Sequence, residues 1–228
     1  MMIETAQRAF ILHTRPYQEH KVLVDCFTRE LGRVAAVTYL PKSPKSDKKG
    51  LLQPFYPLSL SFSGQSSLKT LKQIESASKS IQLVGNALYS GFYLNELLVR
   101  LLPELMPCEE LFCIYSDTLK KLAQGEPIEI TLRSFESALL AELGVSVDFS
   151  VIFNEHVPEW VYLSEQGFVP ASQHPKQRSF KSEHLVAIAN QQLDNNHVLS
   201  CYKLLMRQII SGLLGDKPLN SRALFKRE

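Results

Sequence analysis

The side chains best suited to chemistry in this sequence are lysines and arginines of the first 79 residues. Cations spaced along a surface neutralise the phosphates of a polyanion, and exposed aromatic rings stack on bases. A proline- and serine-rich segment carries four of the cations: Lys42, Lys45, Lys48 and Lys49. Its flanks supply Arg8, Arg15, Lys21, Arg33, Lys69 and Lys72, and the aromatic residues Tyr17, Tyr39 and Phe62. These residues favour a nucleic-acid surface, and the alternative is that residues 42–49 are only a solvated charge run.

The charge is distributed unevenly along the chain. Residues 1–79 hold twelve Lys and Arg against six Asp and Glu, whereas residues 80–228 hold thirteen against seventeen. The first part is therefore +6 and the second −4, which gives the overall +2. Such asymmetry predicts a polyanion-binding N-terminal module attached to a neutral or acidic body.

A second group of cations lies in segments with helical periodicity. Lys203 and Arg207 are four residues apart beside an apolar stripe, and Arg133 directly follows Leu132 in another such segment. Cations beside apolar side chains suit an acidic peptide with a hydrophobic end. The alternative is that these cations form surface ion pairs with Glu136, Glu142 or Asp216.

Motifs for catalysis and metal binding are missing from the sequence. It has no phosphate-binding glycine loop, no dinucleotide fingerprint, no nucleophile elbow and no metalloprotease motif. The four cysteines (26, 108, 113 and 201) form no C-x-x-C pair, so we expect reduced, buried thiols. The six histidines are scattered as well. We therefore expect no catalytic residue, no metal and no cofactor, and an enzyme acting on nucleic acid is the least favoured hypothesis.

The elements that would position the first group of cations are short strands. Alternation of apolar and polar residues predicts strands at 5–13, 21–28, 34–40, 58–63 and 68–75, with a break at residues 15–17. Gly32 lies in the turn after the second strand, where positive φ is required. Two prolines, two serines and a glycine predict no regular structure for residues 41–50. Five short strands in about 75 residues fit an oligonucleotide-binding (OB) barrel.

The rest of the chain is predicted to be mainly helical, which makes the fold class α+β. The first helix, residues 88–102, is apolar almost all round and predicts a buried spine of a second domain. Within it we expect an ion pair of Glu96 with Arg100, and a bond from Asn95 to the backbone of a neighbouring loop. The predicted domains are therefore residues 1–79 and 80–228.

Further helices are predicted at 109–123, at 128–143 with Gly144 as cap, at 182–192 with Ser182 as cap, and at 197–214 capped by residues 194–196. Between them, residues 147–172 lose the helical period, with a hairpin around Gly167. Residues 172–181 are predicted to be a connector. The N-terminus lacks the layout of a signal peptide and no apolar run reaches about 18 residues, so a cytoplasmic location without membrane contact is expected.

Six stretches in the same order resemble the bacterial RecO family of DNA repair and recombination mediators. Three are Arg-Ala-Phe-Ile-Leu-His-Thr-Arg-Pro at 8–16, Phe-Thr-x-Glu-x-Gly-Arg-Val at 27–34 and Leu-Gln-Pro-Phe-x-Pro-Leu at 52–58. The others are Leu-Tyr-Ser-Gly-Phe-Tyr-x-Asn-Glu-Leu-Leu at 88–98, Leu-Arg-x-Phe-Glu-x-Ala-Leu-Leu at 132–140 and Leu-Gly-x-Lys-Pro-Leu-x-Ser-Arg-x-Leu-Phe at 214–225. Together they cover nearly the whole chain.

The resemblance implies an N-terminal OB domain and a C-terminal helical domain. It implies binding of single- and double-stranded DNA and annealing of complementary strands. It also implies recruitment by the acidic tail of single-stranded DNA-binding protein (SSB) and, with RecR, loading of RecA onto SSB-coated DNA. A monomer associated with the nucleoid is expected. The alternative is a peptide-binding adaptor for the SSB tail with weak direct DNA binding.

Two features depart from the family pattern. Some members carry four cysteines as a zinc finger in the helical domain, but residues 147–172 contain none, so a finger here would be metal-free or absent. The Gly-Ala-Arg basic loop of the family corresponds to residues 39–46, which carry lysines in place of the arginine. Lysine lacks the bidentate fork of arginine, so it keeps phosphate contact without a specific pairing.

Overall fold

The computed structural model describes residues 6–40, 47–215 and 217–226, without the side chains of Asp47, Lys48 and Lys226. The chain forms two compact units, residues 1–126 with 219–228 (unit 1) and residues 127–218 (unit 2). Unit 2 is therefore inserted between two segments of unit 1. The boundary expected at residues 79 and 80 falls within unit 1, and as a division between domains it stays a prediction.

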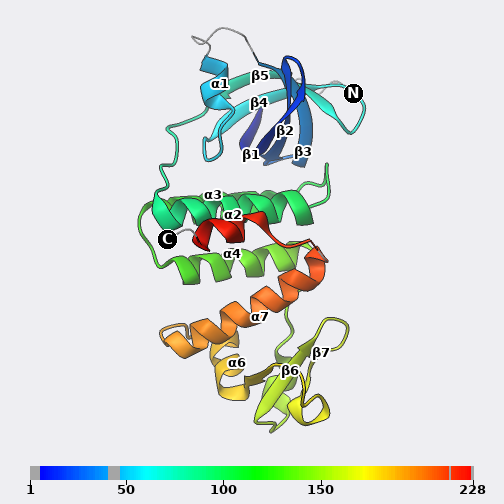
Figure 1. Cartoon of the computed structure of the whole chain (residues 1–228), viewed down its shortest axis with the longest axis vertical. Coiled ribbons are helices and arrows are strands. Elements are labelled where there is room, and N and C mark those ends of the chain that lie inside the picture. The colour runs from blue at the N-terminus through cyan, green and yellow to red at the C-terminus, as the bar shows by residue number, and fades with distance from the viewer. Residues whose placement is uncertain (1–5, 41–46, 216, 227–228) are drawn as a thin grey trace. The chain divides into compact units, whose positions relative to one another are not determined.

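Unit 1 begins with a closed five-stranded barrel, which confirms the predicted fold (Figure 1). Its strands are β1 (Gln7–Gln18), β2 (Lys21–Thr28), β3 (Gly32–Tyr39), β4 (Leu58–Ser63) and β5 (Lys69–Ser76). They close in the order β1-β2-β3-β5-β4, with β3 and β5 parallel and the other pairs antiparallel. Alternate side chains fill the barrel core, among them Ile11, Val24, Val34, Leu60 and Leu71.

Two predictions for the barrel were wrong. Strand β1 continues through Pro16 to Gln18. Because β4 pairs only with residues 7–9 of β1, one edge of the later residues has no partner strand, and an edge tolerates a proline. A short helix, α1 (Asp47–Leu51), also occupies part of the predicted irregular segment. The buried Leu52 and the partly buried Leu51 pack against the barrel core, so tertiary contacts override the local preference.

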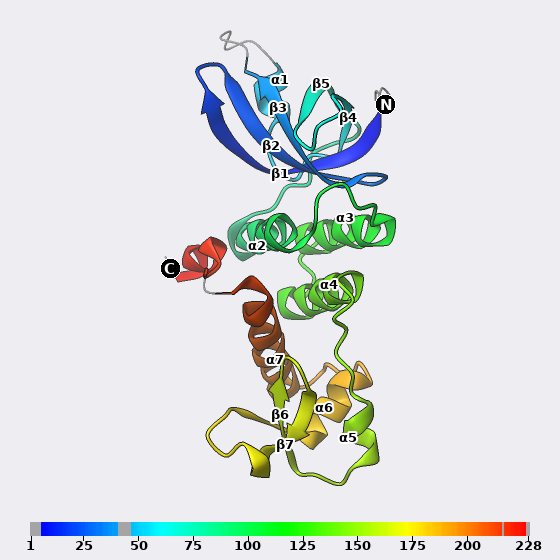
Figure 2. The ribbon, with the colours of Figure 1, turned by 90° about the vertical axis from the view of Figure 1, so that its right-hand side faces the viewer.

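Two helices of unit 1 pack against one end of the barrel, α2 (Gly85–Leu101) and α3 (Glu109–Ala123), while the β1–β2 loop projects at the other end (Figure 2). Phe112 and Tyr115 of α3 contact Phe10 and Phe27, with ring centroids 5.2–5.7 Å apart. Helix α3 has the predicted bounds, and α2 begins three residues before the predicted start. The predicted spine helix is therefore packed against the barrel itself.

Asn95 connects α2 to the barrel and to α3. Its Nδ2 donates to the Leu12 carbonyl (2.9 Å), and its Oδ1 accepts from the Tyr115 hydroxyl (2.6 Å). The expected bond to backbone is confirmed, although the acceptor lies in strand β1 and not in a loop. Burial raises the pKa of Tyr115, so its hydroxyl keeps the proton that it donates.

The C-terminal segment closes unit 1 through Glu96. The expected pair with Arg100 is present at 4.0 Å, but the carboxylate of Glu96 has shorter contacts. It accepts the backbone N–H groups of Asn220 and Ser221 (both 2.8 Å) and the Ser221 hydroxyl (2.6 Å). These groups begin the 3₁₀ helix η2 (Asn220–Lys226), so Glu96 caps it across more than 120 residues of sequence.

Unit 2 surrounds a core that includes Trp160, Phe180 and Leu205. Its helices are α4 (Ile128–Glu142), α5 (Ser150–Asn154), α6 (Ser182–Ala189) and α7 (Asn196–Leu214), with the short η1 (Ala171–Gln173). A sheet of order β7-β6-β8 contains β6 (Glu159–Leu163), β7 (Gly167–Pro170) and β8 (Ser179–Lys181). The hairpin around Gly167 (φ 74°) was predicted correctly, and Gly144, the predicted cap that follows α4, has a positive φ (72°).

Two details of unit 2 correct the predictions. Strand β8 forms within the predicted connector because Phe180 is buried and pairs with Trp160. Ser182 does not cap α6: its hydroxyl donates to the Val157 carbonyl and accepts from Trp160 Nε1 (2.8 Å). Asn195 does cap α7, since its Oδ1 accepts from the backbone N–H of His197 (2.8 Å). No helix in the described residues is long and apolar enough to cross a membrane.

Candidate nucleic-acid interface

The candidate interface is the outer surface of strands β1, β2, β3 and β5. Alternation places Val22, Val24 and Cys26 of β2 inside the barrel, so Lys21, Leu23 and Asp25 face outward. One end of this outer surface is covered, because Phe27 packs on Phe112 and Tyr115. The other end carries exposed cations and aromatic rings.

Strand register brings residues from four strands together at that open end. Lys21 pairs with Gln18 of β1 and with Tyr39 of β3. Two residues further along β2, Leu23 pairs with Arg15 of β1 and with Val37 of β3. Val37 in turn pairs with Thr70 of β5, and Lys72 lies two residues further along β5, at the bulge between β5 and β4. The hydroxyl of Thr38, bonded to the Leu71 carbonyl at 3.3 Å, holds β3 and β5 together there.

We call Arg15, Lys21, Tyr39 and Lys72 the open face. Arg15 and Lys72 are exposed, and Tyr39 is 62% exposed. The Lys21 ammonium lies 5.0 Å from the centroid of the Tyr39 ring, a cation–π distance. Tyr17, which is 41% exposed, lies beside them at an irregularity of the β1–β2 ladder. The four residues of the open face were predicted from the sequence. Leu23 and Val37 were not, although their outward positions follow from strand alternation.

Several predicted residues lie elsewhere. Arg33 bonds to Asp25 (3.0 Å), Glu104 (3.3 Å) and the Leu102 carbonyl (2.9 Å), so its guanidinium is engaged within unit 1. Lys69 is 6% exposed, because it pairs with the inward-facing Ala36 and donates to the Gly64 carbonyl. Phe62 lies in the barrel core at 1% exposed, so the expectation that it serves as a stacking ring was wrong.

Arg8 is exposed but pairs with Ser59 of β4. It lies ten residues before Gln18, the partner of Lys21, which at about 3.3 Å per residue is roughly 30 Å along β1. Lys42 and Lys45 are outside the described residues, as is the side chain of Lys48. Lys49 is exposed on α1, which contacts β5. Of the four lysines in residues 42–49, it is the one whose side chain the structure describes.

The three cations predicted for peptide binding are not equivalent. Arg133 is 4% exposed and Glu136 is fully buried, and Arg133 Nη2 lies 2.6 Å from Glu136 Oε1. Lys203 pairs with Glu129 of α4. Arg207 is exposed and shares a hollow of about 490 Å³ with Arg178, a residue that sequence analysis did not single out. The pair of Arg133 with Glu136, which was considered as a surface ion pair, is present but buried. A contact of Arg133 with a peptide stays an untested prediction, and its burial favours Arg207 for that role.

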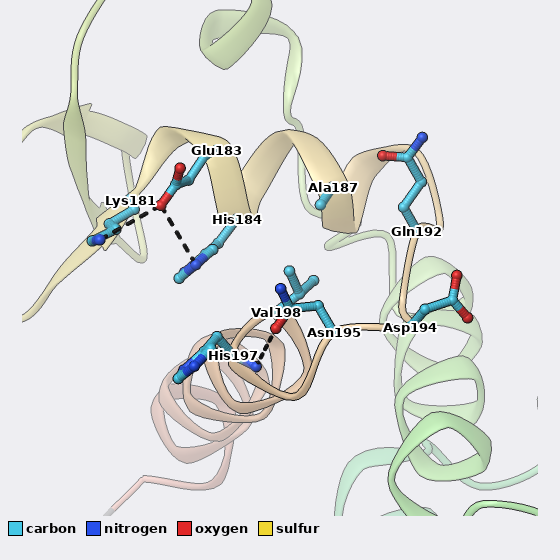
Figure 3. Close-up of a pocket in the computed structure, with 9 residues that line it drawn as sticks. All are labelled: Lys181, Glu183, His184, Ala187, Gln192, Asp194, Asn195, His197 and Val198. Carbon is cyan, nitrogen blue, oxygen red and sulfur yellow. Dashed lines mark hydrogen bonds and ion pairs between the residues drawn. The ribbon is translucent and has the colours of Figure 1, made fainter.

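A polar hollow of about 620 Å³ lies between α6 and the start of α7 in unit 2 (Figure 3). His184 and His197 face it from the two helices, and Glu183 lies 3.5 Å from Lys181 and 3.7 Å from His184 Nε2. In the part of the chain that the structure describes, no group of three or more His, Cys, Asp or Glu side chains could hold a metal ion.

The four cysteines are thiols outside any disulfide, and Cys113 is exposed, so the prediction of burial was wrong for it. It lies on the solvent side of α3, because Phe112 next to it takes the inward position. Burial raises the pKa of Cys201 to about 11. Burial also raises the pKa of Cys26, and the negative charge of Asp25 adds a smaller effect in the same direction. These two buried thiols are therefore poor nucleophiles at neutral pH.

The strand order and the parallel β3–β5 contact define an OB-type barrel, a class that binds oligonucleotides on its second and third strands and the adjoining loops. The open face occupies this position. The chain belongs to the RecO family: the family model Recombination protein O N terminal matches residues 2–79, and Recombination protein O C terminal matches residues 82–222.

Full-length relatives agree with this assignment, and each is named DNA repair protein RecO. The chain is 41% identical to that of Aliivibrio fischeri (strain MJ11) over 229 residues, which cover 98% of this chain and 96% of the relative. It is 39% identical to that of Idiomarina loihiensis over 231 residues, 97% of each chain. It is 42% identical to that of Cellvibrio japonicus over 226 residues, 96% of this chain and 95% of the relative. The resemblance inferred from the six stretches is confirmed.

Proposed function

We propose that this protein acts in DNA repair and homologous recombination as a mediator that binds single- and double-stranded DNA and anneals complementary strands. The family and the name of its relatives support the general role. The open face supports DNA as the ligand of the barrel. No enzymatic step and no cofactor belong to this proposal.

The observation that carries the proposal is the row of outward side chains across four strands. Lys21 pairs with Tyr39, Lys72 is exposed on β5, the strand beside β3, and Arg15 of β1 pairs with Leu23, two residues from Lys21. Because the strands are hydrogen-bonded neighbours about 4.8 Å apart, the cations are held on a rigid surface. Lysine and arginine there would contact phosphates, which all sequences share, so DNA binding with little sequence preference is expected.

The test is the salt dependence of single-stranded DNA binding by a triple variant, Arg15→Ala, Lys21→Ala and Lys72→Ala. Each lost phosphate contact lowers the slope of log K against log salt by about 0.7 for a single strand. We expect the slope to fall by about 2 and the affinity to fall strongly at low salt. Fluorescence anisotropy of a labelled oligothymidine, measured from about 50 to about 200 mM salt, gives both values.

A matched control removes three exposed cations from other surfaces: Lys121→Ala, Lys176→Ala and Lys181→Ala. It changes the net charge by the same amount, so it separates a local contact from general attraction. If the control lowers the slope as much as the triple variant does, the open face is not the DNA site.

We further propose that unit 2 contributes the protein contacts of a mediator. Binding of the SSB tail would recruit the protein to SSB-coated DNA, and RecR would act with it in loading RecA. An isolated monomer is the expected form. Of the three predicted cations, Arg207 is the exposed one, and it shares a hollow with the exposed Arg178, so it is available to a peptide carboxylate. An adaptor that binds the SSB tail and DNA only weakly is the alternative, and the salt experiment separates the two.

A further inference from the structure

The ring of Tyr39 is exposed although it lies at the end of a regular strand. Its exposed fraction of 62% exceeds those of the other exposed aromatic side chains in the described residues, Phe153 (51%), Tyr17 (41%) and Phe225 (40%). Leaving an aromatic ring in water forgoes the free energy of burial, which for a large apolar side chain is about 1.5–3 kcal/mol. The packing of the barrel does not use this ring.

The ring is nevertheless held in a defined place. Tyr39 pairs with Lys21 across the β2–β3 ladder, and the backbone N–H of Leu40 donates to the His20 carbonyl (2.9 Å) just beyond it. The Lys21 ammonium, 5.0 Å from the ring centroid, occupies one face of the ring. The high exposure of the side chain leaves the opposite face available to a flat ligand.

We propose that Tyr39 is the stacking platform for an unpaired base and that it makes the open face prefer single-stranded DNA to duplex. This inference rests on the proposed function, since it assigns a substrate class to the same surface. A single strand can turn a base outward onto the ring, whereas a base in a duplex is already stacked and must be extruded at a cost of a few kcal/mol. Phosphate contacts with Arg15, Lys21 and Lys72 are available to both kinds of DNA, so the ring provides the difference.

The experiment compares Tyr39→Ala with Tyr39→Phe in the full chain. For each we would measure affinity for a labelled oligothymidine and for a blunt duplex of mixed sequence and equal length, at one salt concentration. Loss of a stacked base predicts about 5- to 100-fold weaker single-strand binding for Tyr39→Ala and at most about a twofold change for the duplex. Tyr39→Phe keeps the ring and is expected to bind single strands as the parent does.

Two further measurements sharpen the test. A single strand containing 2-aminopurine should lose fluorescence on binding the parent and Tyr39→Phe, because stacking quenches the base, and should lose less with Tyr39→Ala. Phe153→Ala, which removes an exposed ring from unit 2, is the control and should leave both affinities unchanged. Thermal unfolding of Tyr39→Ala should match the parent, since the ring is largely outside the core.

The outcomes separate the two proposals. Equal losses on single strands and duplex would mean that Tyr39 only supports Lys21, and this would overturn the stacking inference while leaving DNA binding by the open face intact. Unchanged single-strand affinity in Tyr39→Ala would overturn it as well. A parent protein that binds neither DNA would overturn the proposed function, and the inference with it.

Discussion

Replacing Glu136 with leucine is expected to lower the free energy of unfolding of unit 2 by about 3–5 kcal/mol. Glu136 is fully buried, and Arg133, at 4% exposed, is its ion-pair partner at 2.6 Å on the same helix. Without the carboxylate, the buried guanidinium loses its ion-pair partner. Arg133→Met should cost a similar amount, because it leaves the buried carboxylate without its cation.

The double variant Arg133→Met, Glu136→Leu is the control for this prediction. It removes both charges and keeps apolar volume, so its stability should lie within about 1 kcal/mol of the parent or above it. Urea unfolding can be followed through Trp160, the single tryptophan, which is buried in unit 2. Single variants that each cost less than about 1 kcal/mol would show that the pair is not a buried, coupled one.

The same variants separate stability from peptide binding in unit 2. A labelled peptide with the acidic, hydrophobic end of an SSB tail should bind the folded double variant as it binds the parent, and Arg207→Glu should weaken that binding at least about tenfold, the size of a lost charge-assisted bond. Lost binding in the double variant with full binding in Arg207→Glu would place the peptide at Arg133.

Gly32→Ala is expected to destabilise unit 1 by about 2–5 kcal/mol, from a left-handed backbone and a steric overlap together. Gly32 has φ of +70°, and an added Cβ would lie 1.8 Å from the Met106 carbonyl oxygen. The segment around Met106 has little freedom to move, because the backbone N–H of Leu105 donates to the Arg33 carbonyl (2.8 Å). Relieving the overlap would break this bond.

Gly125→Ala measures the backbone strain alone, so the difference between the two variants gives the steric part of the effect. Gly125 also belongs to unit 1 and has φ of +79°, but nothing lies within 4 Å of its added Cβ. It should cost only the backbone strain, about 1–2 kcal/mol. Urea unfolding followed by far-ultraviolet circular dichroism measures both variants. Equal costs for the two glycines would contradict the close approach of the Met106 carbonyl to Gly32.

Sequence periodicity was sufficient to predict the barrel strands because each strand has one buried face. Strand β4 has the predicted bounds, and the positions of Leu58, Leu60 and Phe62 follow from alternation alone. The same alternation could have excluded two of the named residues. Phe62 shares a face with Leu60, and Lys69 shares one with Leu71, so both side chains point inward.

The features that the sequence did not predict depend on contacts between residues far apart in the chain. Arg33 is engaged by Leu102 and Glu104, about 70 residues later, and no local pattern indicates those partners. Strand β8 depends on its register with Trp160, and α1 on the burial of Leu52. For Arg133 the sequence indicated Glu136 as a possible partner three residues away, but no local pattern indicates that both groups are buried.

The most direct test of the proposed DNA surface is to locate the contacts themselves. A single strand with 5-bromodeoxyuridine, irradiated on the protein and digested, reports the peptides that touch DNA. The open face predicts crosslinks in the peptides holding Arg15 to Lys21, Val37 to Leu40 and Leu68 to Lys72, with Tyr39 as a crosslinked residue. Crosslinks confined to unit 2, with none in these barrel peptides, would contradict the proposal.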